Sequence, residues 1–398
     1  MPKQDCCIVG AGPAGLMLGL LLARADLRVT VIEKHDDFLR DFRGDTIHPS
    51  TLEAMDQLGF LDEFLTLPHQ KAPALHAKIR GKAMTIADFS RLPTRCKYIA
   101  FMPQWDFLDF LAAKARAFPG FRLEMGCQTT GLIERNGTVA GVTVRTADGS
   151  ERNLEATLVI GADGRDSIVR KAAGLQVEDL GSSVDVLWMK LSRHKEDPPQ
   201  AMSHGGPTQG LVMIDRGDFW QLGYVIPKEG FGQVQREGIE AFRAKLASVA
   251  PLPADRFEEL AGWENVHLLK VRMDRLKQWW KPGLLCIGDA AHAMSPIGGV
   301  GVNLAIQDAI ATANILAGPL RQGTLTSAHL LAVQKRRSFP TKATQKVQLM
   351  MRRKRKPQGG KPTSGPPAFM RAIARSRLLP HLTGRLIGMG FRPESIRT

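Results

Sequence analysis

The chain has 398 residues, of which 43% are hydrophobic and 23% charged. This composition is typical of a globular protein and excludes disordered and fibrous classes. Its apolar runs are short, the one near the start covering only residues 16–23, so we expect no membrane-spanning helix, which needs roughly 20 apolar residues. The formal net charge of +15 leaves nucleic acid, a membrane surface or an acidic substrate as partners to consider.

The charge excess lies in the last part of the chain. Residues 318–398 hold 18 Lys and Arg against one acidic residue, Glu394, which is a net charge of +17. Residues 1–317 hold 36 basic and 38 acidic residues, a net charge of −2. Because the main body is nearly neutral and the basic run is not interleaved with aromatic residues, we expect no nucleic-acid binding.

Cysteine usage and the amino terminus predict a cytoplasmic protein. The five cysteines are odd in number and lack C-x-x-C spacing, which argues against a disulfide framework and a zinc site. Asp5 stands where a secretory signal would carry positive charge, so we expect no export. The ten histidines show no H-E-x-x-H spacing, so no metal site is predicted.

The chain opens as a βαβ unit over residues 6–32, with a short apolar strand, a glycine turn, a Leu-rich helix and a second strand. In the turn, Gly10, Gly12 and Gly15 fit G-x-G-x-x-G, and Glu33 follows the second strand. Glycines let the backbone approach a pyrophosphate, the helix amino terminus binds it, and the carboxylate accepts ribose hydroxyls. The site therefore favours FAD or NAD over NADP.

The middle of the chain predicts two packing helices and then mainly strands. Helical spacing covers residues 42–67 and 103–118, and Asn-Gly and Asp-Gly pairs mark hairpins between residues 121 and 160. Residues 175–273 alternate as an antiparallel β domain inserted into the first domain. A buried strand at 284–287 and a long helix starting near Val302 follow.

Two further motifs follow buried strands. Residues 161–167 read G-A-D-G-R-D-S, and residues 288–292 read G-D-A-A-H and continue into a glycine-rich loop and N-L-A-I-Q-D-A at 303–309. In this order, the motifs resemble the single-component flavoprotein aromatic hydroxylases, the family of para-hydroxybenzoate hydroxylase, and more loosely the ubiquinone-biosynthesis hydroxylases. The resemblance covers about residues 5–317. It implies an α/β fold: a Rossmann-like FAD-binding domain, an inserted, mostly antiparallel β substrate domain and a helical carboxyl-terminal tail.

The predicted domains alternate along the chain. They are FAD-binding parts at 1–68, 101–175 and 276–330, substrate-domain parts at 69–100 and 176–275, and a basic linker with a helical segment at 331–398.

The resemblance also implies roles for individual residues. The ADP half of FAD is expected at the turn glycines and Glu33, and the ribityl chain at Asp289. The remaining cofactor-binding residues it implies are Arg43, Gln104, Asp163, Gly164, Gly301 and Asn303, and the loop residues Pro296, Gly298 and Gly299 are expected beside the isoalloxazine as catalytic positions. A surface salt bridge is the alternative for Arg43, and a position without a cofactor role is the alternative for Gln104. His292 is expected to pack or hydrogen-bond locally rather than to catalyse.

The resemblance implies an FAD-dependent monooxygenase. NADH or NADPH would reduce FAD transiently, O2 would form a flavin C4a-hydroperoxide, and its distal oxygen would pass to an aromatic or polyketide-like hydrophobic substrate. We expect substrate contacts from the inserted β domain, whose candidates are Trp188, Met189, Met202, Met213, Trp220, Leu222 and Tyr224, although most of these are expected to be core. Tyr224 is the fourth catalytic candidate, through a contact of its hydroxyl with a phenolic substrate.

Alternatives share the first motif. A flavin-dependent halogenase or a prenyl reductase is one, but the W-x-W-x-I-P sequence of such halogenases is not matched by Trp279-Trp280-Lys281-Pro282. A non-catalytic flavin-binding membrane or partner module is another. The basic tail, with apolar positions between its arginines, is interpreted first as a packing segment and second as a weak anchor on the inner face of a membrane. Pro380 is expected to interrupt a helix there.

Overall fold

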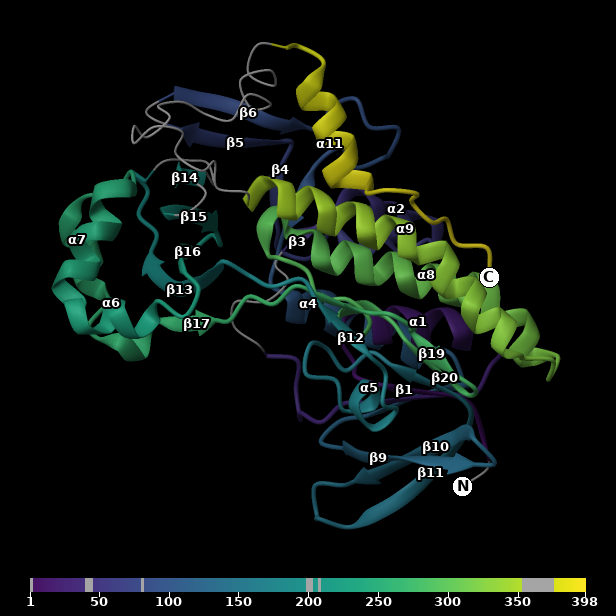
Figure 1. Ribbon diagram of the computed structural model, residues 1–398. Coiled ribbons are helices and arrows are strands. Elements are labelled where there is room, and N and C mark those ends of the chain that lie inside the picture. The colour runs from purple at the N-terminus through teal and green to yellow at the C-terminus, as the bar shows by residue number, and fades with distance from the viewer. Residues whose placement is uncertain (1–2, 40–45, 80–81, 198–202, 207–208, 353–375) are drawn as a thin grey trace, which may run out of the picture.

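The computed structural model describes residues 3–39, 46–79, 82–197, 203–206, 209–352 and 376–398. Two lobes are visible in Figure 1, a parallel-sheet lobe with long helices and a smaller lobe built on an antiparallel sheet. The predicted α/β class with a second, mostly antiparallel β region is confirmed. Arg43 and Met202 lie outside the described residues.

The parallel-sheet lobe is built on the strand order β19-β20-β11-β1-β2-β8. The strands are β1 (Gln4–Val9), β2 (Val29–Ile32), β8 (Phe121–Glu124), β11 (Glu151–Gly161), β19 (Trp280–Lys281) and β20 (Leu284–Cys286). All neighbours are parallel except β19 and β20. The hairpin of β9 (Gln128–Arg135) and β10 (Thr138–Arg145) extends from β11. β1 and β2 are joined by the predicted helix, α1 (Pro13–Arg24).

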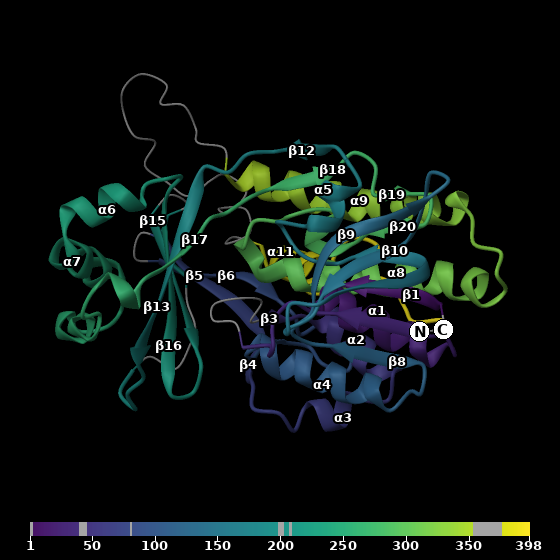
Figure 2. The same ribbon diagram turned by 90° about the horizontal axis from the view of Figure 1, so that it is seen from below.

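The smaller lobe, which we call the seven-stranded lobe, has the strand order β17-β13-β16-β15-β14-β5-β6. The strands are β5 (Ala74–Ile79), β6 (Lys82–Asp88), β13 (Val184–Ser192), β14 (Ser203–Gly206), β15 (Gln209–Asp215), β16 (Phe219–Pro227) and β17 (His267–Leu269). Helices α6 (Phe231–Glu237) and α7 (Ile239–Val249) cover its face away from the parallel-sheet lobe in both ribbon views (Figures 1 and 2). The early strands β5 and β6 thus join a sheet formed mainly by residues 184–269.

Shorter elements connect the lobes. One small sheet has the order β3-β7-β4, from β3 (Thr46–Ile47), β4 (Gln70–Ala72) and β7 (Ile99–Phe101), and another pairs β12 (Val177–Asp179) with β18 (Asp274–Leu276). The remaining helices are α2 (Pro49–Gln57), α3 (Leu61–Phe64), α4 (Gln104–Arg116), α5 (Ile168–Ala172) and the 3-10 turns η1 (Ala254–Glu259), η2 (Trp263–Asn265), η3 (Gly288–Ala290) and η4 (Ile297–Gly299).

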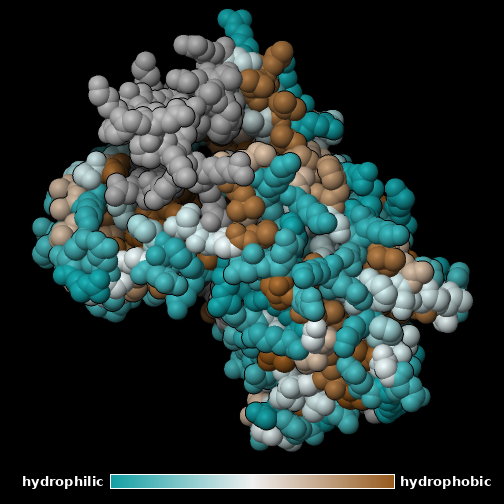
Figure 3. Space-filling model, in the orientation of Figure 1, coloured by the Kyte–Doolittle hydropathy of each residue, from teal (hydrophilic) through white to brown (hydrophobic). Residues whose placement is uncertain are grey.

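Among the described residues, the carboxyl-terminal region contains the helices α8 (Val300–Arg321), α9 (Ser327–Arg352) and α11 (Leu379–Met389). Pro380 stands in the first turn of α11, where its missing N–H costs nothing. A Cβ on Gly384 would lie 2.1 Å from the carbonyl oxygen of Asp88, so α11 packs closely on β6. Leu382 and Leu386 remain exposed, and hydrophobic residues gather over α11 at the top of Figure 3.

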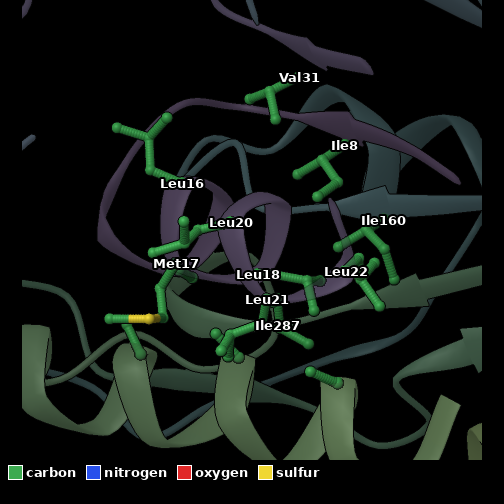
Figure 4. Packing of buried hydrophobic residues seen from close by; sticks show 14 of the residues in the cluster. Ile8, Leu16, Met17, Leu18, Leu20, Leu21, Leu22, Val31, Ile160 and Ile287 are labelled. Carbon is green, nitrogen blue, oxygen red and sulfur yellow. The ribbon is translucent and has the colours of Figure 1, made fainter. Parts of the chain in front are cut away.

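Helix α1 lies at the centre of the main core. Every residue from Ala14 to Ala23 is buried, and Figure 4 shows its leucines between the strands that carry Ile8 and Val31 and a neighbouring long helix. Among the described residues, one apolar helical stretch, Ile297–Arg321, is long enough to cross a membrane, and 78% of its most apolar 18-residue window is buried. Its apolar character therefore reflects core packing.

Candidate active site

Four chain segments with glycines or carboxylates meet at one edge of the parallel sheet. β20, β11, β1 and β2 are consecutive neighbours and run in the same direction, so their carboxyl ends lie side by side. Asp289, Asp163, Gly10 and Glu33 follow these strands in the same order. This edge is where open α/β sheets bind their ligands.

The three turn glycines are required for different reasons. Gly10 has φ +102°, and a Cβ there would lie 2.5 Å from the carbonyl oxygen of Ala162. A Cβ on Gly15 would lie 1.9 Å from the carbonyl oxygen of Gly10. Around Gly12 no atom lies within 4 Å of such a position, and Gly12 caps α1 without a side-chain hydrogen bond. The open side of the turn, at the amino terminus of α1, suits a bound phosphate group.

Glu33 lies against the glycine turn. Its Oε2 accepts the backbone N–H of Ala11 at 3.0 Å, and its Oε1 pairs with the imidazole of His35. The carboxylate is thereby fixed at the end of β2, one strand away from the open side of the turn. A sugar hydroxyl bound beside the glycine turn would find this acceptor in place.

Asp163 links the end of β11 to α5. Its Oδ2 accepts the backbone N–H groups of Ile168 at 2.7 Å and Val169 at 3.2 Å. Burial raises the pKa of this carboxyl, and hydrogen bonds from Ser167 and the two amides offset this only in part. Its Oδ1 is buried and has no hydrogen-bond partner among the described residues. A buried oxygen without a partner is expensive and common at ligand sites.

Asp289 pairs with a residue that motif reasoning did not single out. Its Oδ2 accepts a hydrogen bond from Nε of Arg165 at 2.9 Å, and both side chains are about 30% exposed. Arg165 belongs to G-A-D-G-R-D-S and Asp289 to G-D-A-A-H, so the ion pair joins the two later motifs across the sheet edge. The opposite charges of these two residues were the only signal for this pairing in the sequence.

The loop after Pro296 uses left-handed backbone. Gly298 has φ +82° and Gly299 φ +63°, conformations that favour glycine. The hydroxyl of Thr46 donates to the carbonyl oxygen of Gly299 at 2.9 Å, and a Cβ on Gly299 would lie 2.4 Å from that hydroxyl. The loop is thus held against β3 and leads directly into α8, which begins at Val300.

Asn303 is buried between α8 and α2 rather than at the open edge. Its Oδ1 accepts hydrogen bonds from the hydroxyls of Ser50 and Thr51, the latter at 3.1 Å, and it is 4% exposed. Gly301 stands in the first turn of α8 with nothing within 4 Å of a Cβ position. Asn303 therefore joins the loop's helix to α2, a role that sequence reasoning did not include.

Two further predicted cofactor residues lie in a turn and at the start of a helix. Gly164 follows Asp163 with φ +80° and has open space around a Cβ position. Gln104 is the first residue of α4 and is half-buried. The cofactor contacts expected of these two residues stay predictions.

Tyr224 belongs to the core of the seven-stranded lobe. Its ring lies edge-on to Phe242 of α7, with centroids 5.7 Å apart, and burial raises the pKa of its hydroxyl. The other members of this cluster named as substrate candidates are Met189, Met213, Trp220 and Leu222. They share the helix-covered face, which turns away from the parallel-sheet lobe, so packing explains them and substrate contact by Tyr224 stays a prediction.

The opposite face of that sheet carries a tryptophan over a glycine. Trp188 pairs with Gly223 across β13 and β16, and a Cβ on Gly223 would lie 2.8 Å from the Trp188 ring. Since Leu187 lies in the helix-side cluster, alternation directs Trp188 toward the parallel-sheet lobe. The absence of a side chain at Gly223 therefore makes room for a large aromatic ring on this face.

The comparisons with known proteins agree with this geometry. The model of the protein family described as 'FAD binding domain' matches residues 3–347. The chain belongs to this FAD-binding family. It is 35% identical to a 6-methylpretetramide 4-monooxygenase of Streptomyces rimosus over 352 residues, covering 88% of this chain and 84% of that protein. It is 31% identical to the rifampicin monooxygenase of Streptomyces venezuelae over 316 residues, covering 77% of this chain but only 62% of that longer protein.

A solved structure shows the same fold. PqsL of Pseudomonas aeruginosa, a probable FAD-dependent monooxygenase, superimposes with a TM-score of 0.74 at 22% identity, covering 86% of this chain and 94% of that one. Together with the family match, these relatives establish an FAD-dependent monooxygenase of the para-hydroxybenzoate hydroxylase class. The predictions of the family, the enzyme class and the cofactor FAD are confirmed.

The residues at the sheet edge fit FAD. The space beside Gly12, the fixed carboxylate of Glu33 and the buried free oxygen of Asp163 are what a dinucleotide with ribose and pyrophosphate groups would use. Bound FAD supplies the redox and oxygen-transfer chemistry. The protein's part is to bind, orient and exclude water, and α8 begins at the glycine loop, so its positive end is available to stabilise a negative charge there.

Proposed function

We propose that this monooxygenase hydroxylates an aromatic, polyketide-like hydrophobic compound, with O2 as oxygen source and NADH or NADPH as reductant. The observation that carries the proposal is the 35% identity to a 6-methylpretetramide 4-monooxygenase across 84% of that protein's length. A match that spans nearly the whole relative includes both lobes, and therefore the lobe in which we expect substrate to bind.

In this proposal the sheet edge holds the cofactor. Gly10, Gly12 and Gly15 shape the turn that receives the pyrophosphate, Glu33 accepts the adenosine ribose hydroxyls, and Asp289 accepts ribityl hydroxyls. Oδ2 of Asp289 already accepts a hydrogen bond of 2.9 Å from Nε of Arg165. Cofactor hydroxyls would therefore share this carboxylate with Arg165 or displace the hydrogen bond. Asp163 and Gly164 would line the same edge.

The loop from Pro296 to Gly299 is proposed to pass beside the reacting ring. Its backbone, fixed by Thr46, would present N–H groups in a set geometry, and the start of α8 would favour an anionic cofactor ring. The facing surface of the seven-stranded lobe, with Trp188 stacked over Gly223, would supply an apolar wall for a flat substrate.

A turnover assay with an aromatic panel tests the function. The purified yellow protein is mixed with NADH or NADPH and candidate polyphenols, and products are identified by mass. We expect slow reductant oxidation without substrate and a gain of one oxygen atom in product with it. Rapid reductant loss without any oxygenated product from any compound would contradict the proposal, because uncoupled oxidation alone is not hydroxylation.

The same assay separates the alternative functions. Product halogenation in the presence of bromide or chloride would indicate a halogenase, and reduction of an isoprenoid double bond would indicate a prenyl reductase. Bound FAD with no reductant oxidation under any ligand would indicate a non-catalytic flavin-binding module.

We further propose that the protein is cytoplasmic and makes weak contact with the inner face of the membrane through α11. Leu378, Leu382 and Leu386 recur every four residues and are exposed by 65%, 54% and 38%, so they lie on one face of the helix region. Arg377 and Arg385 are exposed beside them, and the surrounding residues 318–398 carry a net charge of +17. Apolar and cationic side chains together suit an anionic lipid surface.

Co-sedimentation with phosphatidylserine-containing vesicles tests this contact. The double change Leu382→Ser with Leu386→Ser should reduce sedimentation, whereas Leu39→Ser, a 60% exposed leucine elsewhere, should not. Equal sedimentation of both variants and the unchanged protein would exclude α11 as the contact. The five cysteines are all buried and unpaired, which supports the reducing compartment.

A further inference from the structure

A buried carboxylate in α8 contacts the turn that carries Asp289. Asp308 is fully buried, and its Oδ2 accepts the backbone N–H of Gly288 at 3.1 Å and lies 2.6 Å from Nε2 of His292. Its Oδ1 accepts from Nε of Arg337 at 2.8 Å. Both oxygens of Asp308 are thus committed, one to the Gly288 turn and one to α9.

The position of Gly288 leaves little freedom for the turn. Gly288 has φ +59°, and a Cβ on it would lie 3.2 Å from Cβ of Ala14 and 3.5 Å from Cβ of Ala305. The backbone just before Asp289 is therefore enclosed between α1 and α8 and tied to Asp308. A movement of the Asp308 carboxylate would therefore move this turn as well, because the two are joined by the hydrogen bond of the Gly288 amide.

Arg337 reaches a second carboxylate, Glu394, which comes from the end of the chain. The two side chains are 1% and 7% exposed, with Nη1 3.3 Å from Oε1. Arg336 also binds Glu394 through two hydrogen bonds of 2.7 and 3.1 Å. Glu394 is the one acidic residue among residues 318–398, so no neighbour in that part of the sequence can replace its charge.

Other contacts bind the same terminal segment to the helices. The backbone N–H of Glu394 donates to the side chain of Gln307 in α8. The carbonyl oxygen of Ser395 accepts from Nδ2 of Asn314 at 2.8 Å, and the N–H of Ile396 donates to Gln57 of α2 at 2.9 Å. The end of the chain therefore lies along α8 and reaches α2, beside the parallel-sheet lobe (Figure 1).

The buried guanidinium of Arg337 has both of its carboxylate partners, Asp308 and Glu394, only when the terminal segment is bound. Arg337 lies between Asp308 and Glu394, and a buried charge that loses one partner is strongly destabilised or moves toward the other. Without Glu394, Asp308 would be the carboxylate left beside the Arg337 guanidinium, whose other hydrogen bond goes to the carbonyl oxygen of Arg392. The Asp308 carboxylate would then be drawn toward Arg337 and away from its contacts with Gly288 and His292. Two ion pairs therefore connect the carboxyl-terminal segment to the carboxylate that accepts the Gly288 amide.

We propose that the terminal segment, residues 392–397, positions the Gly288–Asp289 turn for FAD through Glu394, Arg337 and Asp308. The three are positioning residues, since they act on the cofactor through Asp289, and the inference rests on the proposed role of Asp289. FAD affinity is then set in part by the carboxylate that Glu394 places beside Arg337.

The test measures FAD dissociation from the holoenzyme by flavin fluorescence on dilution. Glu394→Gln removes the charge and keeps the shape, and it should raise the Kd for FAD by about 3- to 30-fold, the usual size of coupling between connected sites. Asn314→Ala is the matched control, because the hydrogen bonds of Asn314 go to the backbone of Ser395 and Arg397 in the same segment and its loss leaves the ion pairs of Arg337 intact. It should change the Kd less than twofold. Equal effects of the two variants would overturn the proposal.

Two further variants keep the outcome interpretable. Asp289→Asn should weaken FAD binding, and adding Glu394→Gln to it should cost less than Glu394→Gln costs alone, because both act through one turn. Fully additive effects would overturn the coupling. An unchanged Kd in Asp289→Asn would instead refute the assignment of Asp289. If Glu394→Gln does not fold, Arg337→Lys keeps the buried charge but can serve only one carboxylate, and an unchanged Kd there would also overturn the proposal.

Discussion

The two lobes differ in how far their functional side chains can be located. In the parallel-sheet lobe, strand direction collects Gly10, Glu33, Asp163 and Asp289 at one edge, because all four follow parallel neighbours. In the seven-stranded lobe, alternation divides side chains between two similar faces, and the helices α6 and α7 decide which face is core. Sequence motifs therefore predict where a cofactor site at strand ends lies, whereas they do not predict which face of an antiparallel sheet binds the substrate.

The largest expected effect comes from the glycine turn. Gly15→Ala places a Cβ 1.9 Å from a backbone oxygen and should lower the free energy of unfolding by on the order of 3 kcal/mol. Gly12→Ala meets no atom within 4 Å and should change the stability of flavin-free protein by less than about 1 kcal/mol, yet weaken FAD binding. Urea unfolding measures the stability of each variant, and FAD titration measures its affinity for the cofactor. Equal FAD affinity in Gly12→Ala and the unchanged protein would show that the open side does not bind the cofactor.

The next effect contrasts the two faces of the seven-stranded lobe. Trp188→Ala should raise KM for the substrate about tenfold, a loss of about 1.4 kcal/mol, because the ring faces the parallel-sheet lobe. Tyr224→Phe removes a hydroxyl on the helix-covered face. If packing is its whole role, KM and coupling should stay within about twofold, whereas the predicted substrate contact requires a larger change. Steady-state kinetics with product quantified by mass compare them. A large effect of Tyr224→Phe with none of Trp188→Ala would reverse the assignment of the faces.

A smaller effect is expected at Asp163, where burial raises the pKa. A carboxyl with a raised folded-state pKa stabilises the fold when protonated, and this contribution is lost as pH rises through that pKa. Asp163→Asn keeps an acceptor for the α5 amides and avoids the buried charge. It should stabilise flavin-free protein at pH 7 by about 1 kcal/mol, with the gain vanishing in acid, and should weaken FAD binding. Destabilisation at pH 7 would indicate a structural requirement for the charge.

Residues in local motifs could be predicted, and residues defined by distant pairing could not. The position of Glu33 after the second strand of the βαβ unit indicated it, and the resemblance indicated Asp289; both lie at the carboxyl ends of parallel strands. The pairing of Asp289 with Arg165 spans 124 positions, and the hydrogen bond of Asn303 with Thr51 spans 252. Such pairs depend on which helices and loops meet in space, and no spacing rule predicts that. The resemblance implied cofactor contact for Asn303, and the structure adds a buried contact with α2.

The basic tail shows the same division between sequence and tertiary structure. Composition alone located the charge excess in residues 318–398 and showed the main body to be nearly neutral, because charge is additive and needs no coordinates. Only the tertiary structure shows which residues bind Glu394, the single acidic residue of this region. Glu394 is buried against Arg336 and Arg337, since α9 and the end of the chain pack together, and a buried cation is stable only where folding brings it an opposite charge.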